Sequence, residues 1–334
     1  MKKLRKGTIA LIIIDVLVVV GILLVKGPLK NKIIQKNINE KKIIYTLYKD
    51  KDLKNYSVKN TKIKINNKLE EEPEKIETKT SKINEYDIQI LTPDPGNDDY
   101  KLMKLEIGGY EAFLVAIYDP TKVHIITKET LGTSAGERVI SMCNRYGGSV
   151  CINGGTFVDY GYGSGIPMGY VIEGGKIRWS EGDSSVVRGD IIGLTKDGQL
   201  KLLSRVTGNE ALEQGIVDGL EFGPFLIVDG VPQNVGADSV GGYSGAARVA
   251  IAQRKDGIML FLVTNGYHGR GATMGELVDA LVKYGAYNAA NLDGGASSTL
   301  AINGSLVNYP RNIFGELVYG GRPVVDGFGL INRW

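Results

Sequence analysis

The longest apolar pattern in the chain is an almost unbroken run of Ile, Leu and Val from Thr8 to Val25. Its length matches the roughly 18–20 apolar residues that cross a bilayer as a helix. Four Lys and Arg residues lie among the first six positions, as is typical of the residues flanking such a span. No small-residue cleavage site follows, so we predict an uncleaved signal-anchor transmembrane helix over residues 1–26.

The apolar pattern is lost from residue 27 to residue 85, where Lys, Asn and Glu dominate and aromatic residues are few. A segment of this composition buries too little apolar surface to form a core of its own. We therefore predict a basic linker or stalk over residues 27–85 and one globular domain over residues 86–334.

Short apolar runs bounded by Gly, Pro, Asn or Asp follow one another through this domain, as is typical of β-strands. Strands are expected at residues 102–107, 111–118, 123–127, 149–152, 169–172, 186–194, 224–228 and 247–253, and a helix at residues 135–146. Helices are too few to cover a doubly wound sheet. The pattern therefore predicts an α+β domain with a mixed, curved β-sheet and a few helices.

The clearest local unit runs from Ile258 to Asp293, in the order strand, glycine-rich loop, helix, strand. Thr273 and Glu276 have the spacing of a capping box at the start of this helix. The order predicts a βαβ crossover, in which the two strands end at the same edge of the sheet. Asn265 and Asp293 would then lie at neighbouring carboxyl ends.

The charge is divided unequally along the chain. Residues 1–85 carry 20 Lys and Arg against 10 Asp and Glu, a net charge of about +10, whereas residues 86–334 sum to about −7, which gives the overall +3. Clustered lysines beside an apolar segment favour contact with a membrane or a wall polyanion. The globular part has no basic stripe with interleaved aromatic residues, so we expect no nucleic-acid partner.

The two cysteines, Cys143 and Cys151, flank a short glycine-containing turn. Outside the cytoplasm they can form a disulfide. Equally, they can be two small buried residues, one on a helix and one on a strand. The chain has only two histidines and no Cys-x-x-Cys pair, so a zinc site has little support.

The most informative motif begins at Asp293, which follows a short apolar run and precedes Gly294, Gly295 and three hydroxyl residues that include Ser297 and Ser298. The glycines permit a positive φ or a close approach to a ligand, and such a turn exposes N–H and hydroxyl groups to an anion. A carboxylate beside an anion-binding turn suggests hydrolysis or transfer at a phosphorylated or glycosidic centre. The alternative is an Asp-Gly hairpin turn with a polar edge.

A second corner of the same kind, Asn153, Gly154, Gly155 and Thr156, follows another apolar strand. Two such corners at strand ends can face one cleft. The Asn153 amide can donate and accept hydrogen bonds there without adding charge. Its alternative role is that of a turn residue with left-handed backbone geometry.

Three further residues are candidates for charge or proton chemistry. Arg248 begins a strand and Arg322 follows two glycines, and either guanidinium can hold a phosphate through a bidentate pair. The alternative for each is a surface ion pair. His268 lies in a glycine-rich loop before a helix, which suits anion binding or proton transfer, or it is a solvent-facing loop residue.

In their order along the chain, these motifs resemble the phosphodiester glycosidase family, which includes the catalytic domain of the mannose 6-phosphate uncovering enzyme and bacterial exopolysaccharide biosynthesis proteins. The resemblance runs from about Leu102 to Leu330. Besides the corners at residues 153–157 and 291–299, it rests on the segments 119–123, 165–169, 171–175, 223–230, 248–251, 271–277, 307–310 and 321–325.

The chain departs from the family pattern at three positions. The family more often has an aromatic residue in place of Thr156, an aspartate in place of Asn265 and a glutamate in place of Gly321. These replacements question any mechanism that needs an acid at Asn265 or Gly321. Asp293 is therefore the best remaining carboxylate in the matched motifs.

The resemblance implies hydrolysis of a sugar-1-phosphodiester at the anomeric carbon, with Asp293 activating water or stabilising the oxocarbenium-like state. Catalytic roles are thus expected for Asp293, Arg248, Asn153 and His268. Substrate contacts are expected for Gly154, Gly155, Thr156, Asn265, Gly294, Gly295, Ser297, Ser298 and Arg322.

The expected location follows from combining this activity with the predicted anchor. A single-pass protein of the cell membrane with its domain outside the cytoplasm would meet exopolysaccharide or teichoic-acid-like polymers, so a sugar-phosphate polymer or glycan is the expected partner. The residues require no cofactor, and the sequence leaves a divalent cation open. The alternative is a non-catalytic polysaccharide-binding or assembly protein of the same fold.

Overall fold

The computed structural model describes residues 84–159, 164–183, 185–187, 189–235, 246–267, 270–312 and 314–332, together with two short paired strands, β1 (Ile43–Ile44) and β2 (Lys59–Asn60). The chain divides into two compact units, residues 1–101 and 102–334. The expected membrane helix and nearly all of the expected linker lie outside the described residues. Within the described part, no helix is long and apolar enough to cross a membrane. The domain boundaries at residues 26 and 85 therefore stay predictions.

The first unit contains one described helix, α4 (Glu85–Leu91). It begins at Asn84, whose side chain accepts a hydrogen bond from the backbone N–H of Asp87, and Asp87 completes a capping box. Such a cap satisfies backbone N–H groups that the first helical turn leaves unpaired. The helix lies where the globular domain was expected to begin, but it belongs to the first unit and not to the second.

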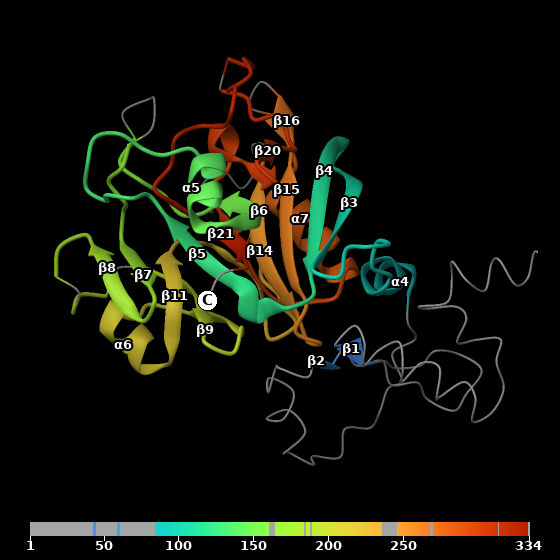
Figure 1. The fold of residues 1–334 in the computed structure, drawn as a ribbon, viewed down its shortest axis with the longest axis horizontal. Coiled ribbons are helices and arrows are strands. Elements are labelled where there is room, and N and C mark those ends of the chain that lie inside the picture. The colour runs from blue at the N-terminus through green and yellow to red at the C-terminus, as the bar shows by residue number, and fades with distance from the viewer. Residues whose placement is uncertain are drawn as a thin grey trace, which may run out of the picture. The chain divides into compact units, whose positions relative to one another are not determined.

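The second unit is built on three antiparallel sheets (Figure 1). The largest has the order β13-β12-β18-β14-β15-β4-β3. Its strands are β3 (Tyr100–Ile107), β4 (Tyr110–Ile117), β12 (Phe225–Val228), β13 (Val231–Pro232), β14 (Val249–Arg254), β15 (Met259–Thr264) and β18 (Ala286–Leu292). Strands β14 and β15 are buried along their whole length, which is why they appear in the sequence as continuous apolar runs.

The other two sheets have five strands each, in the orders β10-β9-β11-β7-β8 and β20-β19-β6-β21-β5. The first is formed by β7 (Tyr170–Glu173), β8 (Lys176–Ser180), β9 (Ile191–Thr195), β10 (Leu200–Leu203) and β11 (Ile216–Glu221). The second is formed by β5 (Val123–Thr127), β6 (Gly148–Asn153), β19 (Leu300–Ile302), β20 (Ser305–Leu306) and β21 (Asp326–Ile331). A small ribbon pairs β16 (Gly266–Tyr267) with β17 (Arg270–Gly271).

Each sheet has a helix packed against it (Figure 1). Helix α5 (Val139–Tyr146) contacts β5, β6, β19 and β21, α6 (Gly208–Glu213) contacts β8 and β11, and α7 (Met274–Lys283) contacts β12 and β18. Two short 3₁₀ helices, η2 (Pro120–Lys122) and η3 (Gly295–Ser297), complete the described helices of this unit. The predicted capping box of Thr273 and Glu276 is confirmed at the start of α7.

The structure confirms a domain of strands and a few helices, in which β-structure predominates. The expected single mixed sheet is replaced by three sheets, and the strand pairs described in them are antiparallel. The predicted crossover is correct in direction, because β15 and β18 both run antiparallel to β14 and hence parallel to each other. The prediction that β15 and β18 are neighbours is wrong, because β14, which comes earlier in the chain, lies between them.

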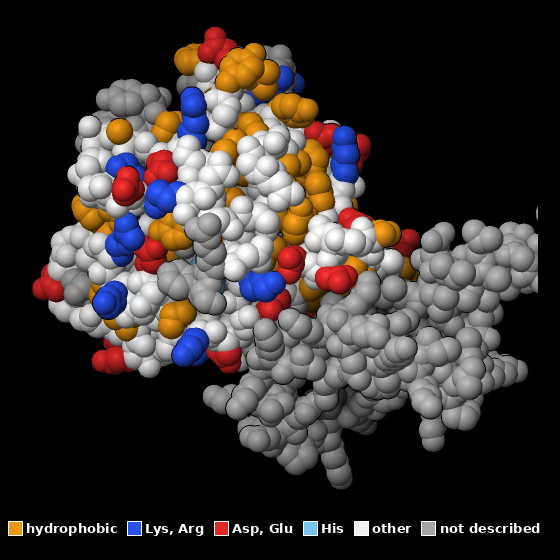
Figure 2. Space-filling model, viewed as in Figure 1, with side chains coloured by type: hydrophobic (Ala, Val, Ile, Leu, Met, Phe, Trp, Pro, Cys, Tyr) orange, Lys and Arg blue, Asp and Glu red, His pale blue; other side chains and the backbone are white. Residues whose placement is uncertain are grey.

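The surface of this unit carries mixed charge. On the face that Figure 2 shows, acidic and basic side chains are interspersed, and no stripe of a single sign crosses it.

Cys143 and Cys151 form a disulfide that joins α5 to β6. Both cysteines are fully buried. Both interpretations of the sequence are therefore partly correct, because the residues do lie on a helix and on a strand, and they are also bonded. A structural disulfide of this kind is typical of proteins that fold in an oxidising compartment.

Replacing both cysteines with serine is expected to lower the free energy of unfolding by about 2–3 kcal/mol, because the short loop loses its cross-link in the unfolded state. Urea unfolding of the oxidised wild type and of the double variant measures this difference. Reduced wild type is the matched control and should unfold like the double variant. Equal stability of oxidised and reduced wild type would contradict the prediction.

Candidate functional site

The two polar corners predicted from the sequence meet in the structure. Asn153 is the last residue of β6 and is fully buried, and Asp293 follows the last residue of β18. The Asn153 side chain donates from Nδ2 to the carbonyl oxygen of Asp293 (2.7 Å) and accepts at Oδ1 from the N–H of Thr299 (2.9 Å). The N–H of Asp293 donates to the carbonyl oxygen of Gly154 (2.9 Å). Asn153 thus joins the ends of two sheets and is not merely a turn residue.

Asp326, the first residue of β21, completes this junction and was not predicted. It is 2% exposed, and its Oδ1 accepts the N–H of Gly155 (2.7 Å). Its carbonyl oxygen accepts the N–H of Gly154 (3.0 Å). The sequence contained a signal for it, a carboxylate placed between the last family-like segment and an apolar run. Asp326 therefore fixes both glycines of the first corner.

The Asp293 and Asp326 carboxyl groups have perturbed and interacting titrations. Burial raises the pKa of Asp326 to about 7, and the negative charge of Asp293 acts in the same direction, whereas the N–H of Gly155 opposes it. Burial raises the pKa of Asp293 to about 6, against the lowering effects of Ser297 and Arg322. Near neutral pH the pair is therefore poised to hold one proton. Perturbed carboxyl pairs of this kind are typical of functional sites.

Arg322 supplies the positive charge that acts on Asp293. Its guanidinium forms an ion pair with Asp159 and lies 5.2 Å from the centre of the Phe157 ring. Its charge lowers the pKa of the Asp293 carboxyl, so it lies within electrostatic reach of that group. Arg322 thus forms the ion pair that was its alternative role and is also part of the site.

Arg248 lies in the protein interior beside the second corner. It is 5% exposed, its Nε donates to the carbonyl oxygen of Ala272 (3.2 Å), and burial lowers the pKa of its guanidinium. Its Cα would lie 3.9 Å from a Cβ placed on Gly294. The structure therefore places the Arg248 backbone beside the second corner, whereas its side chain is a buried cation bonded to the Ala272 carbonyl.

The expectation of an anion-binding turn after Asp293 is not supported by the backbone. The N–H of Gly295 donates to the carbonyl oxygen of Ala247 (2.8 Å), and those of Ser297 and Ser298 donate to carbonyls within the turn. A Cβ on Gly294 would lie only 2.7 Å from the Ala247 oxygen. Glycine at position 294 is thus required for the close approach of the Ala247 carbonyl, and the N–H groups of Gly295, Ser297 and Ser298 are already used.

Some polar side chains around the turn form fewer hydrogen bonds than its backbone N–H groups. The hydroxyl of Ser298 and the Oδ1 of Asn291 are buried, and within the described residues neither has a hydrogen-bond partner. The Ser297 hydroxyl lies close enough to Asp293 to lower the pKa of its carboxyl. A buried polar atom without a partner is costly unless water or a ligand satisfies it. These side chains are therefore the part of the turn that can receive a ligand.

Of the predicted residues that the structure describes, Asn265 does not join this cluster. The Asn265 amide donates to Glu111 Oε2 (2.9 Å) and accepts the N–H of Tyr309 (2.9 Å), so its side chain is already used to hold neighbouring segments. This arrangement does not favour the expected substrate contact. His268 lies outside the described residues, and its role stays a prediction.

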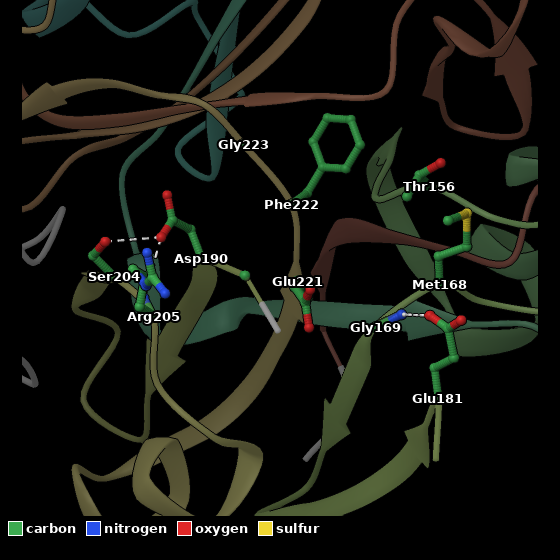
Figure 3. A pocket seen from close by; sticks show the side chains of 11 residues that line it. Thr156, Met168, Gly169, Glu181, Asp190, Ser204, Arg205, Glu221, Phe222 and Gly223 are labelled. Atoms are coloured by element: carbon green, nitrogen blue, oxygen red, sulfur yellow. Dashed lines mark hydrogen bonds between the residues drawn. The ribbon is translucent and has the colours of Figure 1, made fainter. Parts of the chain in front are cut away.

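A pocket of about 560 Å³ opens beside the first corner (Figure 3). Thr156 lines it on one side and Gly223 on another. The Asn291 side chain donates from Nδ2 to the Gly223 carbonyl (3.2 Å), so the strand that leads to Asp293 is bonded to the pocket wall. Thr156 is thereby the predicted binding residue with the most direct access to a cavity.

The described residues contain no group of three or more His, Cys, Asp or Glu side chains that could hold a metal ion.

Alanine at Gly154 is expected to disrupt the site, because its Cβ would lie 2.3 Å from Asp326 Oδ1 and 2.7 Å from Leu220 Cδ2. Overpacking of this kind costs about 1–3 kcal/mol, and relief requires the Asp326 carboxyl to move. Thermal unfolding should show the loss of stability, and Gly275→Ala, on the exposed face of α7, is the matched control. Equal melting temperatures for the two variants would contradict the packing argument.

Comparison with known proteins connects these residues to a family. A family model described as phosphodiester glycosidase matches residues 146–331. The SPbeta prophage-derived uncharacterized protein YomE of Bacillus subtilis (strain 168) is 26% identical over 196 residues, which are 57% of this chain and 30% of that protein. The human N-acetylglucosamine-1-phosphodiester alpha-N-acetylglucosaminidase is 41% identical over 68 residues, 20% of this chain and 13% of that protein. The chain thus spans less than a third of either relative.

Solved structures share the fold. The catalytic domain of the zebrafish N-acetylglucosamine-1-phosphodiester alpha-N-acetylglucosaminidase, auto-inhibited by its pro-peptide, has a TM-score of 0.59 at 20% identity and covers 72% of this chain and 86% of that chain. A hypothetical protein from Synechocystis has a TM-score of 0.53 at 17% identity, covering 69% and 61%. At these identities the likeness shows the fold alone. Asn153, Asp293 and Asp326 all lie inside the family match.

Proposed function

The chain belongs to the phosphodiester glycosidase family, and from this premise we propose that it hydrolyses a sugar-1-phosphodiester at the anomeric carbon. The products are the free sugar and a phosphomonoester. The observation that carries this proposal is the position of Asp293, whose main-chain carbonyl accepts a hydrogen bond from the Asn153 side chain at the first corner and which lies within the matched segment. Burial raises the pKa of Asp293 to about 6, so the carboxylate form dominates near neutral pH.

In the proposed reaction, water attacks the anomeric carbon while the bond from that carbon to the phosphate oxygen breaks. Asp293 accepts the water proton or stabilises the oxocarbenium-like transition state. The electron pair of the broken bond leaves on the phosphomonoester. Because a phosphate is a good leaving group, little general-acid help is needed, and a nearby cation that neutralises the departing charge becomes more important.

Arg322 is the cation that the geometry supports best for this role, because its charge already acts on Asp293. Its ion pair with Asp159 holds the guanidinium in place, and a phosphate oxygen can replace or share this partner. Arg248 would add a second positive charge from the interior. Ser297 and Ser298 would orient hydroxyl or phosphate oxygens of the substrate.

The proposed setting is the outer side of a cell membrane. The Cys143–Cys151 disulfide supports an oxidising compartment, and the apolar run at residues 8–25 supports a membrane anchor. Envelope polymers that contain sugar phosphates, such as exopolysaccharide or teichoic-acid-like chains, would be accessible there. The substrate is therefore proposed to be part of such a polymer.

Hydrolysis of an N-acetylglucosamine-1-phosphodiester by the full chain in oxygen-18 water tests this function. Oxygen-18 in the free sugar would establish cleavage at the anomeric carbon, because water then attacks carbon. Oxygen-18 in the phosphate would instead show cleavage of the phosphorus–oxygen bond and overturn the proposal. Mass spectrometry of both products distinguishes the two results.

A non-catalytic polysaccharide-binding or assembly role is the second candidate. The observation that favours it is the presence of Asn265 and Gly321 where the family more often has acids, together with the engagement of the Asn265 amide by Glu111 and Tyr309. Retention on immobilised wall polymer, without release of sugar from any tested phosphodiester, would support this role over hydrolysis.

A further inference from the structure

The pocket beside the first corner has walls of two kinds (Figure 3). Met168 and Phe222 provide apolar surface, and Glu181, Asp190 and Glu221 provide carboxylates. Its volume of about 560 Å³ lies within the range of about 300–1,000 Å³ that is typical of small-molecule sites. The cavity is therefore large enough for one sugar residue and part of a second group.

This pocket borders the chain segments that carry the Asp293 site. Thr156 lines it, and a Cβ on the preceding residue, Gly155, would lie 3.3 Å from the carbonyl oxygen of Glu221, which also lines it. On the other side, Asn291 donates to the Gly223 carbonyl two residues before Asp293. A ligand in the pocket is thus held next to the two chain segments that carry Asn153 and Asp293.

Two of the carboxylates are held in place by the protein. Asp190 Oδ1 accepts from the Ser204 hydroxyl (2.9 Å) and the N–H of Arg205 (3.2 Å), and Glu181 Oε2 accepts from the N–H of Gly169 (3.1 Å) (Figure 3). A carboxylate has about four acceptor positions, so each retains capacity for a ligand hydroxyl. Of these two carboxylates, Asp190 is half-buried and Glu181 is exposed.

The third carboxylate, Glu221, lies between two glycines. A Cβ on Gly169 would be 2.6 Å from its Cδ and Oε2, and a Cβ on Gly189 would be 2.6 Å from its Oε1. Glycine at both positions leaves room for the carboxylate in the middle of the cavity, where Figure 3 shows it. Any side chain at either position would have to displace it.

The lining charges indicate which ligands fit. Among the described lining residues, three carboxylates accompany one cation, Arg205, and this balance disfavours a phosphate or a carboxylate in the cavity. Hydroxyl groups can donate to the carboxylates, and the apolar face of a sugar ring can pack on Phe222 and Met168. An ammonium group would be accepted as well.

We propose that this pocket binds the sugar ring of the substrate and selects a neutral or amino sugar over one that carries a carboxylate or a phosphate. This inference rests on the proposed function, because the pocket is assigned to the sugar side of the cleaved bond. The phosphate side is then left to Arg322. Thr156 lines the pocket, and the next residue, Phe157, stacks on Arg322. The proposed sugar side and the proposed phosphate side of the cleaved bond therefore lie next to each other.

The test compares Glu221→Gln with wild type, using full-length protein and an N-acetylglucosamine-1-phosphodiester. The variant keeps the shape of the side chain and loses its charge, so we expect KM to rise about tenfold with kcat within about twofold. Gly189→Ala should produce the same effect by displacing the Glu221 carboxylate. Glu213→Gln, on the exposed end of α6, is the matched control and should leave both constants unchanged.

Sugar selection is measured on the wild type. The corresponding glucuronic acid phosphodiester is expected to have a kcat/KM at least tenfold below that of the N-acetylglucosamine compound, and Glu221→Gln should narrow this ratio. Unchanged KM in both pocket variants, or an unchanged ratio, would overturn the proposal and leave the hydrolytic function standing.

Binding without turnover separates the two proposals. Saturation-transfer NMR with free N-acetylglucosamine is expected to show binding by wild type and weakened binding by Glu221→Gln. If this result is found in a protein that hydrolyses no phosphodiester, the pocket assignment stands and the hydrolytic function falls. Equal binding by wild type and both pocket variants would overturn the pocket assignment.

Discussion

Replacing Asp293 with asparagine is expected to lower kcat/KM for a sugar-1-phosphodiester by about 10²–10⁴-fold, the usual contribution of a general acid or base. Asparagine keeps the size of the side chain but cannot accept a proton from water or stabilise a positive anomeric centre. The backbone contacts that join Asp293 to Asn153 and Gly154 do not depend on the carboxyl group, so the junction should persist. Steady-state kinetics together with thermal unfolding measure both effects.

The matched control for this variant is Asp279→Asn, the same change at an exposed position on α7. It should retain wild-type activity. Turnover by Asp293→Asn within about threefold of wild type would remove Asp293 from the catalytic role. A variant that fails to fold would be recognised by its unfolding curve, and Asp293→Glu, which restores the charge on a longer side chain, would then be the informative comparison.

Asparagine at Asp326 is expected to change how stability depends on pH. Burial raises the pKa of Asp326 from 3.8 to about 7, so the folded state binds this proton more tightly than the unfolded state. The free energy of unfolding therefore falls as pH rises from about 4 to about 7, where the unfolded chain has released the proton and the folded one has not. Asparagine does not titrate, so in the variant the free energy of unfolding lacks the decrease between pH 4 and pH 7 that the Asp326 proton causes.

The size of the effect follows from the shift. At about 1.4 kcal/mol for each pKa unit, the stability of Asp326→Asn relative to wild type should increase by about 4 kcal/mol between pH 4 and pH 8. Urea unfolding at several pH values measures the relative stability. Asp279→Asn should follow the wild-type curve. Parallel curves for Asp326→Asn and wild type would show that the Asp326 carboxyl does not titrate abnormally.

The parts of the fold that sequence patterns predicted best are those determined by local composition. Strand β5 has the predicted bounds, 123–127, because an Asp-Pro turn precedes it and its side chains are almost all buried. The start of α7 was predicted because a capping box is a local hydrogen-bond pattern. The helix expected at 135–146 begins later, at Val139, because Glu137 pairs with Val324.

Long-range arrangement was predicted less well. The position of β14 between β15 and β18 depends on pairing partners and not on any pattern within the three segments. Short strands such as β10 and β20 were missed because four and two residues are too few to show a period. Asp326 was missed with β21, although the apolar run of that strand is visible in the sequence.

Within the site, the residue types at the two corners were easier to predict than the hydrogen bonds that their atoms form. The two corners lie next to each other, since the Asn153 side chain donates to the main-chain carbonyl of Asp293, whereas the prediction that they face one cleft stays a prediction. That the turn after Asp293 offers its N–H groups to an anion is wrong for Gly295, since the Ala247 carbonyl takes that group. Sequence spacing identifies donors and acceptors, but only the packed structure shows which of them are already paired.

The bonds that form the site join residues that are very distant in the chain. They connect Asn153 with Asp293 over 140 positions and Gly155 with Asp326 over 171 positions. Contacts of such large sequence separation require closure of long loops before they can form. We therefore expect the junction of Asn153, Asp293 and Asp326 to remain unassembled until β21 has been synthesised and has entered between β5 and β6, so that the site is completed only after nearly all of the described chain has been made.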